Sequence, residues 1–196
     1  MIPLGPPLGY PMEVMRKVSY ILLFLALIPA VAGPQGMQQP LAQDAPGQAL
    51  VGMLREVRLA MYFSALAILA PTIKDQHLYA QQVVNILEGS EGKHFMAHGQ
   101  GKVMGLIPAV DRLQDTLPSL PEPRMRRALF ILENIRAYLR FTLEEALATL
   151  GGKDLRVGAD HMRKAFAFLY FVSSGEERPP LGGLRALLRY LHSPSP

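Results

Sequence analysis

The stretch RMRRALFILENIRAYLRFTLEEALATL, residues 124–150, decides the fold. Its apolar residues recur every three or four positions, at Leu129, Leu132, Ile135, Leu139, Leu143, Ala146 and Leu150. This spacing places them on one face of an α-helix, which over 27 residues is about 40 Å long. A long helix with one apolar face must bury that face against other helices, so the stretch predicts a helical bundle.

Further helices are predicted on both sides of this one. Pro123 suits its first position and Gly151-Gly152 ends it. The helix that follows, over residues 157–173, carries one apolar stripe of Met162, Phe166, Leu169 and Val172, widened by Phe168 and Phe171. The remaining helices are expected over residues 49–70, 74–88, 106–117 and 184–191. No strand pair with hairpin turn residues is found, so we expect an all-α domain, a single bundle of five to six helices over residues 48–192, with a tail at 193–196.

The N-terminal region has the parts of a secretory signal peptide in their usual order. Arg16-Lys17 is basic, residues 20–28 (YILLFLALI) are apolar, and Ala30-Val31-Ala32 forms a cleavage motif before Gly33. The apolar run is shorter than the roughly 20 residues of a membrane span. We therefore expect residues 1–32 to be removed on export, with an uncleaved membrane anchor as the alternative.

The residues around this signal fit no folded element. Residues 1–14 are rich in Pro and Gly and precede the basic segment, so translation could start at Met15 or Met12 instead. Residues 33–47 (GPQGMQQPLAQDAPG) lack periodicity and predict a flexible linker. The helix over residues 49–70 is apolar all round in its second half, which favours a central bundle position. A second membrane span is the alternative.

Composition narrows the function class. The chain has 196 residues, 49% hydrophobic and 18% charged, with no Cys and a net charge of +4. Disulfide scaffolds, thiol catalysis and thiolate metal sites are thereby excluded, and so small a charge does not indicate nucleic-acid binding. Richness in Arg, Pro, Ala and Leu with only two Asn is typical of a GC-rich source and compatible with a thermophilic one.

Candidate chemistry is sparse. His94 and His98 have the i, i+4 spacing of metal ligands on a helix, but they lie in a Gly-rich stretch, so two solvated histidines are the simpler interpretation. A non-covalent haem could use Met53, Met61 or Met162, although such methionines are more often core residues. No nucleophile motif, phosphate loop or dinucleotide motif occurs, so no cofactor and no catalytic residues are expected.

Charged clusters are expected to be solvated. Glu144-Glu145 are adjacent and so point in different directions on a helix, and Asp160-His161 fits a surface acid beside a surface histidine. Several basic residues lie along the long helix and the helix after it. They could bind an anionic lipid or polymer, although an ordinary solvated face is the preferred interpretation. They are Arg124, Arg126, Arg127, Arg136, Arg140, Arg163 and Lys164.

Glu88 breaks a local rule. On the helix over residues 74–88, Tyr79, Val83, Ile86 and Leu87 share the apolar face, and Gln81, Gln82, Asn85 and Glu88 share the opposite one. Glu88 falls in the last turn, where an acid opposes the helix dipole by about 0.3–1 kcal/mol. Gly89 and an irregular Gly-rich segment to Gly105 follow. We expect Glu88, together with Asn85, to anchor this loop by accepting N–H groups of residues 90–93.

The segment Gln82-Val83-Val84-Asn85-Ile86-Leu87-Glu88-Gly89 resembles a motif of uncharacterised exported helical bacterial proteins, Asn-x-(Ile/Leu)-Glu-Gly. In those proteins a His precedes the motif and a Gly/Asp-rich loop follows it, before a helix similar to residues 105–110. The resemblance covers about 35 residues. Here Gln82 replaces the His, and the loop contains Glu91 but no Asp. These differences argue against an acidic metal-binding loop in this chain. The resemblance implies an exported helical domain and no activity.

These features favour an exported, non-enzymatic bundle that binds or scaffolds an envelope protein or ligand. The alternative is a bundle that binds a metal or small ligand through residues 88–98, with Glu88, His94 and His98 as candidate ligands. An enzyme is the third and least favoured class, because the sequence contains no visible set of catalytic residues. Membrane contact would come only through an uncleaved signal segment.

Export predicts cleavage between Ala32 and Gly33. Expression of the full chain in a secreting bacterium should yield a mature protein that begins at Gly33, and N-terminal sequencing of the periplasmic or secreted fraction measures this. A protein recovered there that begins at Met1 or Met15 would contradict the prediction.

Overall fold

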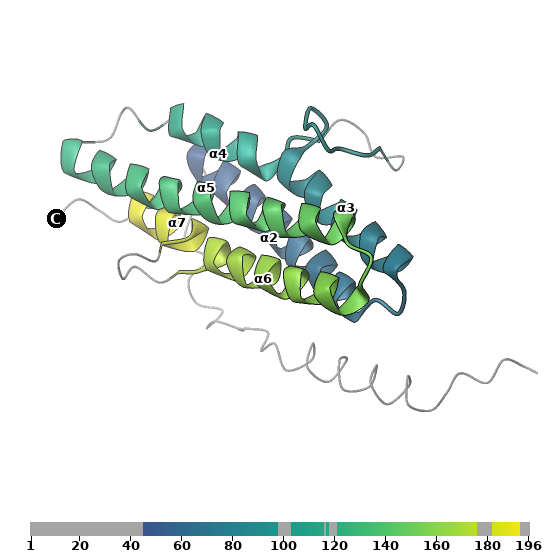
Figure 1. The fold of residues 1–196 in the computed structure, drawn as a ribbon. Helices are drawn as coiled ribbons and strands as arrows, with labels where there is room; N and C mark the ends of the chain where they lie inside the picture. The colour runs from purple at the N-terminus through teal and green to yellow at the C-terminus, as the bar shows by residue number, and fades with distance from the viewer. Residues whose placement is uncertain (1–44, 98–102, 116, 118–120, 176–181, 193–196) are drawn as a thin grey trace, which may run out of the picture. The chain divides into compact units, whose positions relative to one another are not determined.

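The computed structural model describes residues 45–97, 103–115, 117, 121–175 and 182–192, which form six helices and no strand (Figure 1). The expected all-α bundle of five to six helices is thus confirmed. The signal segment 1–32, linker residues 33–44 and the tail 193–196 lie outside the described residues. Within the described part, no helix combines the length and the apolarity that a membrane span needs.

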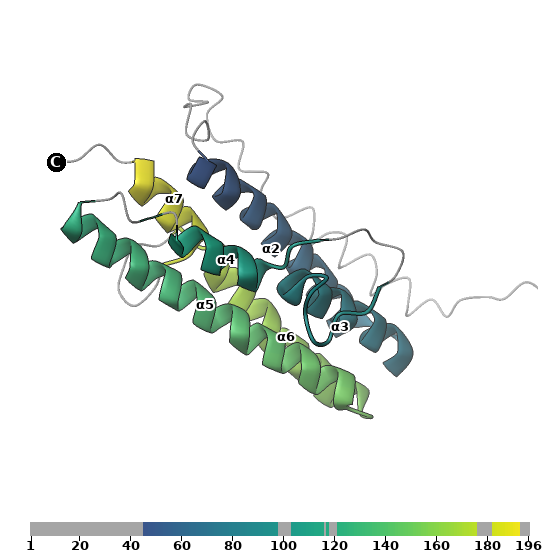
Figure 2. The same cartoon turned by 90° about the horizontal axis from the view of Figure 1, so that it is seen from above.

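Four helices form a ring in which neighbours are antiparallel. They are α2 (Ala45–Leu69), α3 (Ile73–Glu88), α5 (Glu122–Gly151) and α6 (Leu155–Ser173), and the adjacent pairs are α2 with α3, α3 with α5, α5 with α6, and α6 with α2. Two short helices, α4 (Leu106–Asp115) and α7 (Leu184–His192), pack against the N-terminal halves of α2 and α5. In Figure 2, α4 lies between α2 and α5.

Helix boundaries differ from the expected ones by a few residues. α2 begins at Ala45, so the last three residues of the expected linker are helical, and Pro46 is tolerated because the first-turn N–H groups need no helical acceptor. α5 begins at Glu122, which moves Pro123 to the second position. α6 begins at Leu155 because Asp154 accepts hydrogen bonds from the N–H groups of Val157 and Arg156, which hold the pKa of Asp154 below its usual value.

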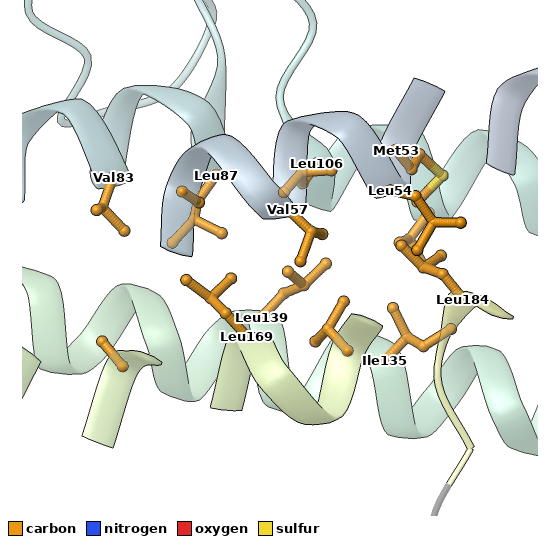
Figure 3. Packing of buried hydrophobic residues seen from close by; sticks show 14 of the residues in the cluster. Met53, Leu54, Val57, Val83, Leu87, Leu106, Ile135, Leu139, Leu169 and Leu184 are labelled. Atoms are coloured by element: carbon orange, nitrogen blue, oxygen red, sulfur yellow. The ribbon is translucent and has the colours of Figure 1, made fainter. Parts of the chain in front are cut away.

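The core lies inside the ring and extends under α4 and α7. Figure 3 shows its side chains converging from α2, α3, α5 and α6, together with Leu106 of α4 and Leu184 of α7. The stripe predicted on α5 is correct at Leu132, Ile135, Leu139 and Ala146, which are fully buried. On α6, Met162, Leu169 and Val172 are fully buried.

The aromatic part of the α6 stripe was predicted wrongly. Phe166 is only half-buried, and Ala165 takes its expected place in the core. Phe168 and Phe171 are also half-buried and stack against Tyr138 of α5, with ring centroids 6.1 and 5.4 Å apart. Side chains at positions 162, 165, 169 and 172 point inward, so a residue at 166 or 168 must lie on the flank of the helix.

Gln76 joins two helical hairpins, α2–α3 and α5–α6, at the ends where the helices of each pair are connected. Its buried amide donates to the carbonyls of Ala67, at the end of α2, and Leu155, at the start of α6, over 3.2 and 3.0 Å. The Gln76 carbonyl oxygen lies 2.1 Å from the place where a Cβ on Gly158 would be. A side chain at position 158 would therefore displace the Gln76 amide, and α3 and α6 approach each other closely there.

The two halves of the bundle have the same pattern of burial. A shift of 82 positions carries Thr72, the N-cap of α3, onto Asp154, the N-cap of α6. The same shift carries buried residues onto buried residues: Leu50 onto Leu132, Met53 onto Ile135, Val57 onto Leu139, Val83 onto Ala165, and Leu87 onto Leu169. Each half therefore consists of a long, a medium and a short helix, α2–α3–α4 and α5–α6–α7.

Leu139→Ala should destabilise the protein by about 2–5 kcal/mol, because it removes a fully buried side chain where antiparallel helices meet. Phe166→Ala should cost clearly less, since that ring is already partly in water. Thermal and urea unfolding of the two variants measure the difference. A larger loss for Phe166→Ala would show that the core is centred elsewhere.

Candidate functional site

Asn85 binds the loop after α3 through a pair of hydrogen bonds to the backbone of one residue. Its side-chain N–H donates to the Met96 carbonyl over 2.8 Å, and its side-chain oxygen accepts the Met96 N–H over 3.1 Å. Asn85 is 3% exposed. Because a buried amide must satisfy both its donor and its acceptor, this paired geometry fixes where the loop crosses α3.

Gln81 extends the same network by one helical turn. Its amide donates to the side-chain oxygen of Asn85 over 3.0 Å and to the His94 carbonyl over 2.8 Å. Gln81 is also buried. The polar face of α3 is therefore covered by residues 94–96 of the loop, and its amides replace the backbone partners that an irregular segment lacks.

Glu88 contacts the loop, at a different residue from the ones expected. Its two carboxylate oxygens accept the backbone N–H of His94 and face the His94 ring Nδ1, each over 2.7 Å, whereas residues 90–93 were the expected donors. The Glu88 side chain is 10% exposed. Gly92 packs against it so closely that a Cβ there would lie 2.2 Å from the Glu88 Cβ. Charged hydrogen bonds of this kind can offset an unfavourable helix dipole.

Glycines close the loop at its two ends. Gly89 has φ +71°, a conformation that other residues rarely adopt, and its N–H donates to the Asn85 carbonyl. A Cβ on Gly105 would lie 2.2 Å from the backbone of Glu88. The chain returns to the end of α3 at a bridge between Gly89 and Met104, where the Ser90 N–H donates to the Val103 carbonyl over 2.9 Å.

The metal candidates are not gathered into a ligand set within the described residues. No group of three or more His, Asp or Glu side chains comes together there. Residues 91–97 are not helical, so the i, i+4 spacing does not place His94 on a helix face. His94 instead contacts Glu88 through Nδ1. His98 lies outside the described residues.

Two charges that were expected to be solvated pair across the α5–α6 hairpin. Glu145 faces the ring Nδ1 of His161 over 2.5 Å and Lys164 over 3.6 Å, while Glu144 is exposed. The partners are 16 and 19 positions apart on different helices, so no local spacing rule connects them. The pair joins two helices, and the neighbouring Asp160 binds Arg163.

Most of the basic stripe on α5 is engaged within the fold. Arg136 binds Asp111 of α4 over 2.9 Å and Glu133 over 2.5 Å. Burial alone would lower the pKa of Arg136, but the hydrogen bonds with Glu133 and Asp111 outweigh it and raise that pKa. The ion pair with Asp111 holds α4 against α5.

The start of α5 is tied to α7 in a comparable way. Arg124 donates to the carbonyls of Tyr190 and Leu191, over 2.8 and 3.3 Å. The guanidinium groups of Arg124 and Arg127 lie over the Tyr190 ring, 5.6 and 5.5 Å from its centroid. These cations stabilise the fold, which leaves fewer of them for an anionic surface than the sequence suggested.

A pocket of about 380 Å³ lies between the N-terminal half of α2 and α4. Met53 of α2 and Leu106 and Leu113 of α4 contribute apolar walls, and two charged residues, Glu56 and Arg112, also line it. Met104 and Gly105, at the end of the anchored loop, complete one side. The loop network thus holds in place the segment that leads into one wall of the pocket.

Small residues on α2 keep this pocket open. Ala49 and Gly52 line it, and a Cβ on Gly52 would have no atom within 4 Å. The 82-residue shift carries Ala49 onto Ile131, and there the matching space is filled, because Ile131 packs within 3.0 Å of the Cβ position of Gly182. Sequence analysis missed the pocket. The available signal was Gly52, a glycine inside a helix, which costs about 1 kcal/mol relative to alanine.

Comparison of the chain with protein-family models, curated proteins and solved structures finds no match. The resemblance of residues 82–89 to exported helical proteins therefore stays a prediction.

Glu88→Gln should lower stability by about 1–2 kcal/mol, because a neutral acceptor binds the His94 N–H less strongly than a carboxylate does. Amide hydrogen exchange should accelerate over residues 89–97 and 103–105 and change little in α5 and α6. The matched control is Glu144→Gln, at an exposed acid of α5. Equal exchange in both variants would contradict the anchoring role of Glu88.

Proposed function

We propose that this chain is an exported, non-enzymatic helical bundle that acts by binding at the cell envelope, and that the pocket between α2 and α4 is its binding site. Export rests on the ordered basic, apolar and Ala-x-Ala segments of residues 16–32. The observation that carries the binding role is the pocket, because its volume of about 380 Å³ and its mostly apolar walls are those of a small-molecule site.

The placement of the charged pairs supports a binding role rather than catalysis. Glu88–His94 holds the loop on α3, and Glu145–His161 joins α5 to α6. Neither pair contributes a side chain to the walls of the pocket. In a catalytic site we would expect such acid–histidine pairs to face the cavity that receives the substrate.

The second candidate function is a small-ligand-binding bundle that uses the Glu88–His98 region itself. One observation favours it: Met104 and Gly105, at the far end of the same loop, line the pocket. The two candidates then describe one site, in which the anchored loop supports a wall of the pocket.

Filling the pocket should abolish binding without harming the fold. Gly52→Leu places an apolar side chain into free space and replaces glycine with a better helix former, so stability should be unchanged or higher. We expect the variant to bind the apolar dye anilinonaphthalene sulfonate at least about tenfold more weakly than the full wild-type chain, a loss of about 1.4 kcal/mol. Fluorescence titration measures this affinity.

The matched control is Gly151→Leu, because Gly151 is the exposed last residue of α5 and also has no atom within 4 Å of its Cβ position. This variant should bind the dye as the wild type does. If both variants bind equally well, the pocket is not the binding site.

A further inference from the structure

The pocket carries two opposite charges on different helices. Glu56 belongs to α2 and is half-buried, and Arg112 belongs to α4 and is exposed. Within the described part of the chain, neither residue forms an ion pair or a side-chain hydrogen bond. Other half-buried charges of this bundle do have partners, as Glu88, Glu145 and Arg136 show. Glu56 and Arg112 are therefore available to a bound molecule.

The second half of the bundle shows what these two positions look like without a pocket. The 82-residue shift carries Glu56 onto Tyr138, whose ring stacks on Phe168 and Phe171. Just before the short helices, Gly105 and Gly183 occupy equivalent places. The Gly105 carbonyl accepts the Ala109 N–H, and the Gly183 carbonyl accepts the Leu187 N–H.

The short helices thus correspond by a shift of 78 positions, as Gly105 and Gly183 show, and this shift carries Arg112 onto Tyr190, whose ring lies under Arg124 and Arg127. Two tyrosines whose rings contact other side chains thus correspond, in the half with the pocket, to an acid and a base that line it. The smaller side chains Ala49 and Gly52 accompany this exchange on α2.

We infer that the pocket binds a single-chain zwitterionic amphiphile of the lysophosphatidylethanolamine kind, an inference that rests on the proposed function. The hydrocarbon chain would lie against Met53, Leu106 and Leu113, where apolar burial contributes about 0.8 kcal/mol per CH₂ group. The primary ammonium would donate hydrogen bonds to Glu56, and the phosphate would accept them from Arg112, for which a guanidinium is well suited.

Charge and volume both select this class. An anion such as a fatty acid would meet the Glu56 carboxylate, and a simple amine would meet the Arg112 guanidinium, so each would gain one attraction and one repulsion. A head group with both charges gains two attractions. A volume of about 380 Å³ is near the lower end of small-molecule pockets, which favours one chain over the two chains of a bilayer lipid.

The test compares head groups on one chain length. Four C12 probes are titrated, below their micelle concentrations, into the full wild-type chain by calorimetry: lauroyl lysophosphatidylethanolamine, laurate, dodecylamine and dodecanol. We expect the zwitterion to bind about tenfold more tightly than each of the others. Lauroyl lysophosphatidylcholine should also bind more weakly, because its quaternary ammonium cannot donate a hydrogen bond to Glu56.

Two variants assign the recognition to the named residues. Glu56→Gln should reduce the affinity for the zwitterion about tenfold and leave laurate bound at least as well. Arg112→Gln should reduce the affinity for the zwitterion about tenfold and leave dodecylamine bound at least as well. The controls are Glu144→Gln and Arg58→Gln, exposed charges outside the pocket, which should change nothing. Thermal melts show whether each variant is folded.

The outcomes separate this inference from the proposed function. If all four probes bind equally and Gly52→Leu removes them all, the pocket is a binding site but the head-group inference is overturned. If no probe binds and Gly52→Leu leaves dye binding unchanged, the proposed function fails as well. Preference for the zwitterion that survives both Glu56→Gln and Arg112→Gln would also overturn the assignment.

Discussion

The bundle is built around a mismatch of helix lengths. α5 has 30 residues and is about 45 Å long, whereas its partner α6 has 19 residues and is about 28 Å long. α2 exceeds α3 in the same way, with 25 residues against 16. The inner faces of the long helices would meet water beyond the ends of α3 and α6, so each half needs a short helix to cover them. α4 and α7 supply this cover, and α4 is preceded by non-helical residues within the described part, at 91–97 and 103–105.

An irregular segment beside a core must satisfy its backbone polar groups without helix or sheet partners. In the first half, Gln81, Asn85 and Glu88 do this from the polar face of α3. Their bonds hold residues 94–96 in place, and Gly89 and Gly105 allow the close return of the chain. The cost of Glu88 against the helix dipole is thereby offset by two contacts with His94.

Sequence periodicity predicted the helices because the spacing of apolar residues along one helix is a local property. Leu132, Ile135 and Leu139 were placed correctly for that reason. Glu88 was singled out because it breaks a local rule, yet its partner was predicted wrongly, since a Gly-rich segment has no period from which to read its path. Glu145–His161 and the pocket were missed because each depends on which helices become neighbours.

The two halves share a pattern of burial, so their differences mark where one half has a separate requirement. Packing alone would favour a large residue at position 49, as Ile131 shows in the second half, and would disfavour Gly52 inside a helix. Gly52 reduces helix stability, and both small residues line the same pocket. Marginally stable proteins retain such residues where function needs the space. The departure of α2 from the pattern of α5 is therefore the feature of the fold on which the proposed binding role rests.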